Sequence, residues 1–281
     1  MRRLSNPNTT RRLAMLIAAA LLSTASAGAA RAQQCGNDAA GFPAWANAFK
    51  AKATAQGISA ATANAVLSTA AYDSNVIRLD RSQRSFKLSF EQFYARRVSS
   101  SLINRGQGML RTHAALLARI EQRFGVPGAV MIAIWGLETN FGSDGSGGKP
   151  IVNSLATLAY DCRRSDFFQN ELINALRIID RRDMSTDQLR GGWAGEIGPM
   201  QFLPSSYIKY AVDFDGDGRR NLINSVPDFL ASTANYLKGY GWKAGQPWTP
   251  GTANYAVIQQ WNKAEVYAQT IAVMSAKLAG R

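Results

Sequence analysis

The spacing of apolar residues predicts a mainly α-helical fold. Over most of the chain, apolar side chains recur every three or four positions, which places them on one face of a helix. The alternation of apolar and polar residues that is typical of strands is nearly absent. Residues 165–181 are predicted to form an amphipathic helix, whose apolar face consists of Phe168, Leu172, Ala175 and Ile179.

Several shorter helices are predicted within residues 43–124. Ser59 suits the N-cap of a helix over Ala61–Leu67, and residues 110–124 read as one helix that ends at Gly125. Aromatic residues also recur here at helical spacing. We interpret them as core residues rather than as a ligand platform: Phe86, Phe90, Phe93 and Tyr94.

The segment Val126–Gly142 is apolar on nearly every side and is therefore predicted to be a buried helix. Pro127 suits its first turn, and Gly142 suits a stop at its end. The only ionisable side chain is Glu138. Burial and the negative end of the helix dipole both disfavour the charged carboxylate and raise its pKa, as a general acid requires. The alternative is a structural carboxylate that reaches water or pairs with an arginine.

A second informative segment is Gly191–Tyr207, in which glycines and prolines stand among aromatic residues. This composition predicts a tight loop whose backbone approaches a ligand or another segment closely. Gln201 supplies both a hydrogen-bond donor and an acceptor, and Glu196 is the rival candidate for a catalytic acid. The alternative is a structural loop that braces the core.

Alternating carboxylates in Asp213–Gly218, with a glycine at the sixth position, match the first half of a calcium-binding loop. The twelfth position, where a glutamate is expected, is Asn224. Asp228 follows and could close a longer loop. The alternative is an acidic turn that binds no ion.

The first 32 residues predict a cleaved export signal. Arginines precede the apolar run Leu13–Leu22, and Ala30-Arg31-Ala32 forms a small-x-small cleavage site. The run is too short to span a bilayer as a helix. We therefore expect a mature chain that is exported to the periplasm, without a transmembrane segment. The sequence leaves open whether the general or the twin-arginine route is used.

The composition describes a basic chain that can bury a sizeable core. It has 281 residues, of which 46% are hydrophobic, and a formal net charge of +13. A basic exported protein favours an anionic partner, such as the cell wall, a lipid surface or a nucleic acid. Nucleic acid is the least favoured of these, because the sequence lacks helix-turn-helix, zinc-finger and ribonucleoprotein motifs.

The chain has two cysteines, Cys35 and Cys162, and one histidine, His113. In an oxidising compartment an even pair of cysteines favours a disulfide over two free thiols. A single histidine excludes histidine-rich metal sites and disfavours a serine–histidine triad. We expect His113 on a helix surface.

Several sequence blocks, taken in order, resemble the lytic murein transglycosylases of the B type. They read GLETNFG, NSLATLAYDCRRSDFFQNEL, GGWAGEIGPMQFLPSSYIKYAVDFDGDGRRNLINSVPD, ASTANYLKGYGW and QQWNKAEVYAQTIAVMS. The resemblance implies a lysozyme-like catalytic core, residues 126–242, set into a helical domain formed by both chain ends. Residues 33–125 would supply its N-terminal part, and residues 243–281 would complete the groove. Some family members carry a partly β insertion after Trp242, which this shorter sequence is expected to lack.

The resemblance also implies an activity. Glu138 would be the only acid/base and would protonate the glycosidic oxygen between N-acetylmuramic acid and N-acetylglucosamine. It would then take the proton of the muramyl 6-hydroxyl, which closes a 1,6-anhydro ring without a water molecule or a second carboxylate. No cofactor is expected for the chemistry, and the expected partner is a peptidoglycan glycan strand. Two alternatives remain: a hydrolytic muramidase at the same site, and a non-catalytic peptidoglycan-binding protein.

Further site residues follow from the same resemblance. The residues that match or fall near substrate-contacting positions are Gln201, Tyr236, Asn262 and Tyr94. Two others depart from the family pattern. Trp261 stands where a tyrosine is usual, and Glu196 stands where small residues are common, which suggests a variant groove residue. A structural calcium ion would be held by the set Asp213, Asp215, Asp217, Arg219 and Asp228.

Overall fold

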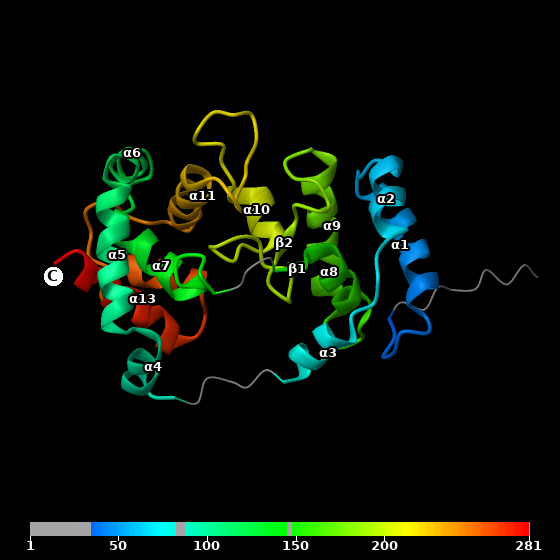
Figure 1. Cartoon of the computed structure of the whole chain (residues 1–281), viewed down its shortest axis with the longest axis horizontal. Helices are drawn as coiled ribbons and strands as arrows, with labels where there is room; N and C mark the ends of the chain where they lie inside the picture. Colours follow the sequence, from blue (N-terminus) through cyan, green and yellow to red (C-terminus); the bar gives the residue numbers. More distant parts are fainter. Residues whose placement is uncertain (1–34, 83–87, 145–147, 281) are drawn as a thin grey trace, which may run out of the picture. The chain divides into compact units, whose positions relative to one another are not determined.

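Helices make up nearly all the regular structure of the chain (Figure 1). The computed structural model describes residues 35–82, 88–144 and 148–280. The predicted export signal and Phe86 lie outside the described residues. The helices are α1 (Phe42–Ala55), α2 (Ala60–Leu67), α3 (Ser74–Arg81), α4 (Phe90–Arg97), α5 (Ser100–Thr112), α6 (Ala114–Phe124), α7 (Gly128–Thr139), α8 (Ile151–Tyr160), α9 (Ser165–Asp180), α10 (Pro204–Tyr210), α11 (Val226–Gly239), α12 (Ala253–Trp261) and α13 (Glu265–Leu278).

Two short strands complete the regular structure of the described residues. Strand β1 (Lys149–Pro150) pairs antiparallel with β2 (Arg190–Gly191), so that Lys149 lies opposite Gly191. The pairing joins the segment after α7 to the start of the glycine-rich loop. The predicted mainly α fold is therefore confirmed.

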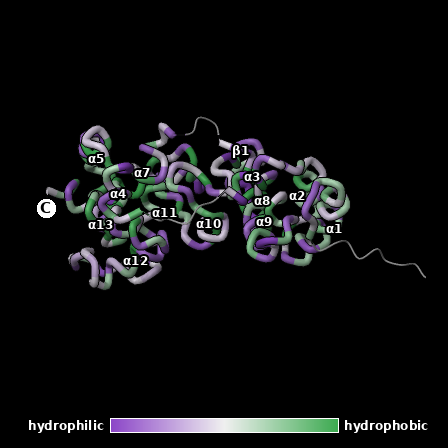
Figure 2. The backbone as a smooth tube through the Cα atoms, turned by 90° about the horizontal axis from the view of Figure 1, so that it is seen from below, coloured by the Kyte–Doolittle hydropathy of each residue, from purple (hydrophilic) through white to green (hydrophobic). Residues whose placement is uncertain are grey.

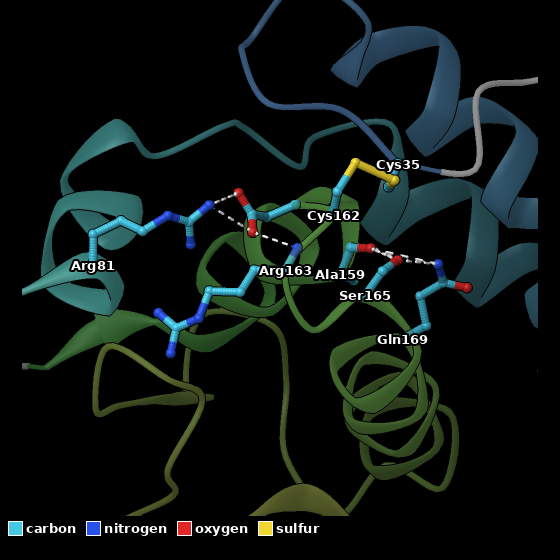
Figure 3. The surroundings of a disulfide bond; sticks show 8 residues. Cys35, Arg81, Ala159, Cys162, Arg163, Ser165 and Gln169 are labelled. Atoms are coloured by element: carbon cyan, nitrogen blue, oxygen red, sulfur yellow. Dashed lines mark hydrogen bonds and ion pairs between the residues drawn. A yellow bond between two sulfur atoms is a disulfide. The ribbon is translucent and has the colours of Figure 1, made fainter. Parts of the chain in front are cut away.

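One group of helices gathers around α8 and α9, which pack side by side (Figure 1). Helices α1, α2 and α3 contact this pair. Ser59 caps α2 as predicted, because its hydroxyl oxygen accepts the backbone N–H of Thr62 at 3.2 Å. The disulfide Cys35–Cys162 ties the first described residue to the turn after α8, which confirms the predicted pair (Figure 3).

A second group surrounds α7, which contacts α5, α6, α11 and α13. Every residue from Gly128 to Leu137 is buried, so the all-round apolar pattern is confirmed as a buried helix. Helix α13 also contacts α4 and α5. Segments that precede and follow α7 in the sequence therefore enclose it.

The ends of α7 differ from the prediction by a few residues. Pro127 is the N-cap rather than a member of the first turn. At the other end, Asn140 is the C-cap in the left-handed region, with a φ of 50°. Asparagine tolerates this conformation, so the helix stops before Gly142 is reached.

The prediction of one helix over residues 110–124 is wrong. The chain breaks at His113, which ends α5 and begins α6. No glycine or proline marks this break. After the break, Leu117, Ile120 and Phe124 are buried on one face of α6. His113 is half-buried with its ring centroid 6.0 Å from that of Trp135, and burial lowers its pKa.

Most helices contain both hydrophobic and hydrophilic residues (Figure 2). After Trp242 the described residues form a loop, α12 and α13, and they contain no strand, in line with the expected lack of a β insertion. Across the described ranges, no helix combines the length and the hydropathy that a membrane crossing needs.

Candidate active site

Two cavities meet at the end of α7, and Glu138 and Gln201 line both of them. The first cavity, of about 400 Å³, is also lined by Glu196, Phe202, Leu203, Ser206, Tyr236, Gln260, Trp261 and Asn262. The second, of about 570 Å³, extends along the glycine-rich loop past Gly192 and Pro199. The predicted catalytic glutamate thus stands where two binding spaces join.

The environment of Glu138 favours its protonated form. Burial at the end of an apolar helix raises the pKa of the carboxyl, as the sequence predicts. The hydrogen bond from Trp261, the nearby hydroxyl of Tyr267 and the charge of Arg97 act in the opposite direction, while the charge of Glu196 raises the pKa further. A carboxyl with a raised pKa at the junction of two cavities is suited to act as a general acid.

Trp261 contacts the carboxyl directly. Its indole Nε1–H donates to Oε1 of Glu138 at 2.9 Å. Its ring packs edge-on against Phe202 and Tyr236, with centroid distances of 5.4 and 5.0 Å. The sequence predicts a stacking surface at this position, and the structure adds a hydrogen-bond donor aimed at the glutamate.

Tyr236 lines the first cavity and is fixed by its own hydrogen bond. Its hydroxyl donates to the backbone oxygen of Gln260 at 2.7 Å. Asn262 follows Trp261 as the C-cap of α12, and its side-chain oxygen accepts the backbone N–H of Ala264 at 3.0 Å. The structure therefore brings Tyr236, Trp261 and Asn262 together beside Glu138.

Two residues near Glu138 were missed by the sequence interpretation. Tyr267 of α13 is buried, and its hydroxyl makes no hydrogen bond of ordinary geometry to the other described residues. Burial and the charge of Glu138 nevertheless raise its pKa well above the usual range. Arg97 of α4 donates a hydrogen bond to the backbone oxygen of Leu137. Tyr267 lies in the same sequence block as Trp261, which could have indicated it, whereas nothing in the sequence indicated Arg97.

The loop after β2 is as tight as its composition predicts. The backbone N–H of Gly192 donates to the oxygen of Glu196 at 2.8 Å, and Ile197 forms bridges with both Gly191 and Phe202. A Cβ atom at Gly191 would lie 1.9 Å from the oxygen of Glu196, so only glycine fits there. Gln201 adopts a φ of 55°, and its Nε2 donates to the oxygen of Gly198 at 2.9 Å.

Glu196 places a second carboxylate in the first cavity. Its Oε2 accepts the backbone N–H of Ala194 at 2.9 Å, and burial raises its pKa. A Cβ atom at Gly192 would lie 2.2 Å from this oxygen and 3.0 Å from Oε1 of Gln201. Two acceptor oxygens therefore converge above Gly192, beside Glu138.

Tyr94 is placed apart from the other candidate residues. It lies half-buried in α4, with its ring centroid 5.6 Å from that of Phe90. It is not among the residues that line the two cavities described above.

The acidic loop brings three carboxylates together. Oxygens of Asp213, Asp215 and Asp217 lie within 4.8 Å of one another, which suits a hard cation with oxygen ligands. A hydrogen bond from Ser225 lowers the pKa of Asp215. Gly218, at the sixth position, has a φ of 86° that favours glycine.

The remaining two residues of the predicted ligand set, Asp228 and Arg219, do not belong to this group of carboxylates. The fully buried Asp228 accepts the backbone N–H groups of Phe214 and Asn221, each at 2.8 Å, and so closes the loop through hydrogen bonds. It lies outside the group of three carboxylates. Arg219 is exposed, and its backbone N–H donates to Asp217 at 2.8 Å.

Comparison with known proteins extends this description. A family model described as the transglycosylase SLT domain matches residues 41–252. Over 132 residues, the chain is 43% identical to the membrane-bound lytic murein transglycosylase B of Escherichia coli K12. This alignment covers 46% of the chain but 36% of that relative, so the match spans about a third of the curated protein.

Solved structures match most of the described fold. SltB3 from Pseudomonas aeruginosa, in complex with NAG-anhNAM-pentapeptide, has a TM-score of 0.79 and 31% identity, over 85% of this chain and 80% of its own. The Escherichia coli lytic transglycosylase Slt35, in complex with calcium, has a TM-score of 0.74 and 26% identity, over 88% and 96%. These matches confirm the predicted lysozyme-like fold, and the chain belongs to the lytic transglycosylase family that the SLT domain defines.

Proposed function

We propose that this protein is a peptidoglycan lytic transglycosylase that cleaves the bond between N-acetylmuramic acid and N-acetylglucosamine. The observation that carries the proposal is the placement of Glu138, a carboxyl whose pKa is raised by burial, at the junction of two cavities. The SltB3 complex supports the substrate class, because its ligand contains an anhydromuramic unit.

In this reaction Glu138 acts first as an acid and then as a base. It gives its proton to the glycosidic oxygen as the bond to C1 breaks. The resulting carboxylate takes the proton of the muramyl 6-hydroxyl, whose oxygen closes the 1,6-anhydro ring on C1. Gln201, Tyr236 and Asn262 line the first cavity and are assigned to sugar binding.

A hydrolytic muramidase is the second candidate, and Glu196 is the observation that favours it. Two carboxylates in one cavity resemble the arrangement with which many glycosidases direct a water molecule. In that case water, rather than the 6-hydroxyl, would attack C1.

Mass spectrometry of muropeptides released from purified sacculi separates these functions. We expect products that end in 1,6-anhydromuramic acid. Products that end in a reducing sugar, heavier by one water, would support the muramidase instead. A folded protein that releases no product would overturn both enzymatic assignments and favour a peptidoglycan-binding protein.

Replacing Glu196 with Gln is expected to shift the pH dependence of the reaction. The charge of Glu196 raises the pKa of Glu138, so its removal lowers that pKa. Glu138 then loses its proton at a lower pH, and the alkaline limb of kcat moves in the same direction. The measurement is a pH profile of both proteins on the same glycan. An unchanged alkaline limb would show that the two carboxylates act independently.

We also propose that the acidic loop binds a structural calcium ion, with Asp213, Asp215 and Asp217 as ligands. Their clustered oxygens support this assignment, and Slt35 is a relative solved with calcium. An ion that binds only the folded chain stabilises it. At a calcium concentration near a hundredfold the Kd, we expect the Tm to rise by about 5–10 °C relative to chelated protein.

A matched variant controls this experiment. The double substitution Asp213→Asn and Asp217→Asn removes two ligand charges from the exposed loop, and its Tm should not respond to calcium. A wild-type melting curve that is the same with calcium and with a chelator would contradict the proposed calcium site.

We propose that the mature protein works in the periplasm, with residues 126–242 as the catalytic core and residues 243–281 completing the groove. The disulfide supports an oxidising compartment. Trp261, Asn262 and Tyr267, all close to Glu138, support the role of the C-terminal segment.

A further inference from the structure

We propose that Trp261 positions the catalytic carboxyl by occupying one of its oxygens, so that the proton leaves and returns at Oε2 of Glu138 alone. This inference rests on the proposed function and assigns Trp261 a role beyond sugar stacking. The observation that carries it is the hydrogen bond from Nε1 of Trp261 to Oε1 of Glu138, at 2.9 Å.

The chemistry of indole makes this bond selective. Indole Nε1–H can donate a hydrogen bond but cannot accept one. The carbonyl oxygen of a neutral carboxyl is a better acceptor than its hydroxyl oxygen, so a donor held on Oε1 favours the acidic proton on Oε2. The same bond persists after proton transfer, because Oε1 is an acceptor in the neutral acid and in the carboxylate.

Both proton transfers then use one atom. In the first, the O–H bond at Oε2 breaks as the glycosidic oxygen gains the proton and its bond to C1 cleaves. In the second, Oε2 takes the proton of the 6-hydroxyl as its oxygen bonds to C1. The carboxyl is neutral before and after this sequence, so protons and electrons balance.

The indole is held in the plane that this bond requires. Phe202 and Tyr236 pack edge-on against it at interplanar angles of 79° and 76°. Tyr236 is fixed in turn by its hydrogen bond to Gln260. Trp261 is also the last residue of α12, so its backbone is set by the helix. A donor fixed in this way limits the rotation of the carboxyl.

Other groups face Glu138 from the remaining elements. Tyr267 of α13 and Arg97 of α4 favour its charged form, and Glu196 of the glycine-rich loop disfavours it. Trp261 differs from them because its indole N–H donates to one specific oxygen of this carboxyl, Oε1, at 2.9 Å. Trp261 therefore determines which oxygen carries the proton, while Tyr267, Arg97 and Glu196 shift the pKa of the carboxyl.

The test is the substitution Trp261→Phe, which keeps an aromatic ring and removes the N–H. We expect kcat to fall roughly 10- to 100-fold, the range for losing a hydrogen bond to a charged group, with KM changed by less than about twofold. Losing a donor that favours the carboxylate raises the pKa of Glu138, so the alkaline limb of kcat should move to higher pH. This direction is opposite to that expected for Glu196→Gln.

The matched control is Trp242→Phe. Trp242 is a buried tryptophan whose indole N–H has no hydrogen-bond partner among the described residues. This variant should keep the wild-type kcat and pH profile. A Trp261→Phe enzyme with unchanged kcat and alkaline limb, or with only a raised KM, would overturn the proposal and leave Trp261 a stacking residue.

A second measurement needs no altered tryptophan. In ¹⁵N-labelled wild-type protein, the indole resonance of Trp261 should titrate with Glu138, and this titration should vanish in Glu138→Gln. An indole resonance that does not titrate would overturn the proposal even if Trp261→Phe fails to fold. If wild-type protein releases no anhydromuramic product, the proposed function fails, whereas the resonance still tests the hydrogen bond by itself.

Discussion

Replacing Glu138 with Gln is expected to lower kcat by roughly 10²- to 10⁴-fold, the range that a general acid–base group supplies. The amide has nearly the same shape and can still accept the indole N–H of Trp261, but it cannot donate a proton to the glycosidic oxygen. Release of anhydromuropeptides from sacculi, measured against time, gives the rate. Activity near the wild-type level would show that another group supplies the proton.

The same substitution should leave the fold intact. Burial raises the pKa of Glu138 in the folded chain, so folding favours the protonated form. This stabilisation is complete below the pKa of the unfolded chain and is lost as the pH rises through the folded pKa. Gln does not ionise. At neutral pH the variant should therefore melt at the same temperature as the wild type or at a higher one.

An exposed glutamate provides the control for this comparison. Glu121 lies on the surface of α6 and does not line either cavity described above. Glu121→Gln makes the same substitution at an exposed site and should retain the wild-type rate. A similar loss of activity in both variants would point to a general effect of replacing a glutamate rather than to proton transfer by Glu138.

Removing the disulfide is expected to lower the free energy of unfolding by about 2–4 kcal/mol, the typical value for a native disulfide. Cys35 and Cys162 are separated by 127 residues, so the bond closes a long loop in the unfolded chain. The double substitution Cys35→Ser and Cys162→Ser, unfolded in urea, measures the loss. Reducing agent should destabilise the wild type by a similar amount and leave the double variant unchanged.

The catalytic rate should change little in this double variant at a temperature where it remains folded. The disulfide lies beside α1 and α8, and the residues that contact Glu138 come from other elements. Beside the disulfide, Arg81 pairs with Asp161 at 2.7 Å (Figure 3). The backbone N–H of Gly36 also donates to the oxygen of Tyr160 at 2.8 Å, which helps to hold the N-terminal segment without the bond. A double variant with wild-type stability in urea would mean that such contacts alone hold the N-terminal segment.

Much of the helical structure is readable from the sequence, because burial leaves a periodic pattern. The apolar segment before Glu138 forms the buried helix α7, and residues 165–180 form α9. The glycines of the loop after β2 indicate its tight turns, since a side chain at Gly191 would collide with the backbone. In each case the local sequence and the tertiary contacts favour the same conformation.

Other features depend on contacts between distant segments and leave no local pattern. The break at His113, which ends α5 and begins α6, has no glycine or proline to indicate it. The donor role of Trp261 requires α12 to lie beside the end of α7. Arg97 and Tyr267 come from α4 and α13 and meet only through the packing around Glu138. Periodicity and motif spacing do not contain this information.

The origin of the residues around Glu138 also has a consequence for biosynthesis. The glutamate lies in the middle of the chain, whereas Trp261 and Tyr267 belong to α12 and α13, near its C-terminal end. Because a polypeptide is made from its N-terminus, α7 exists before the residues that enclose its carboxyl. A nascent or truncated chain would therefore carry the glutamate without its tuned environment, and the proposed activity would arise only once α12 and α13 have been made.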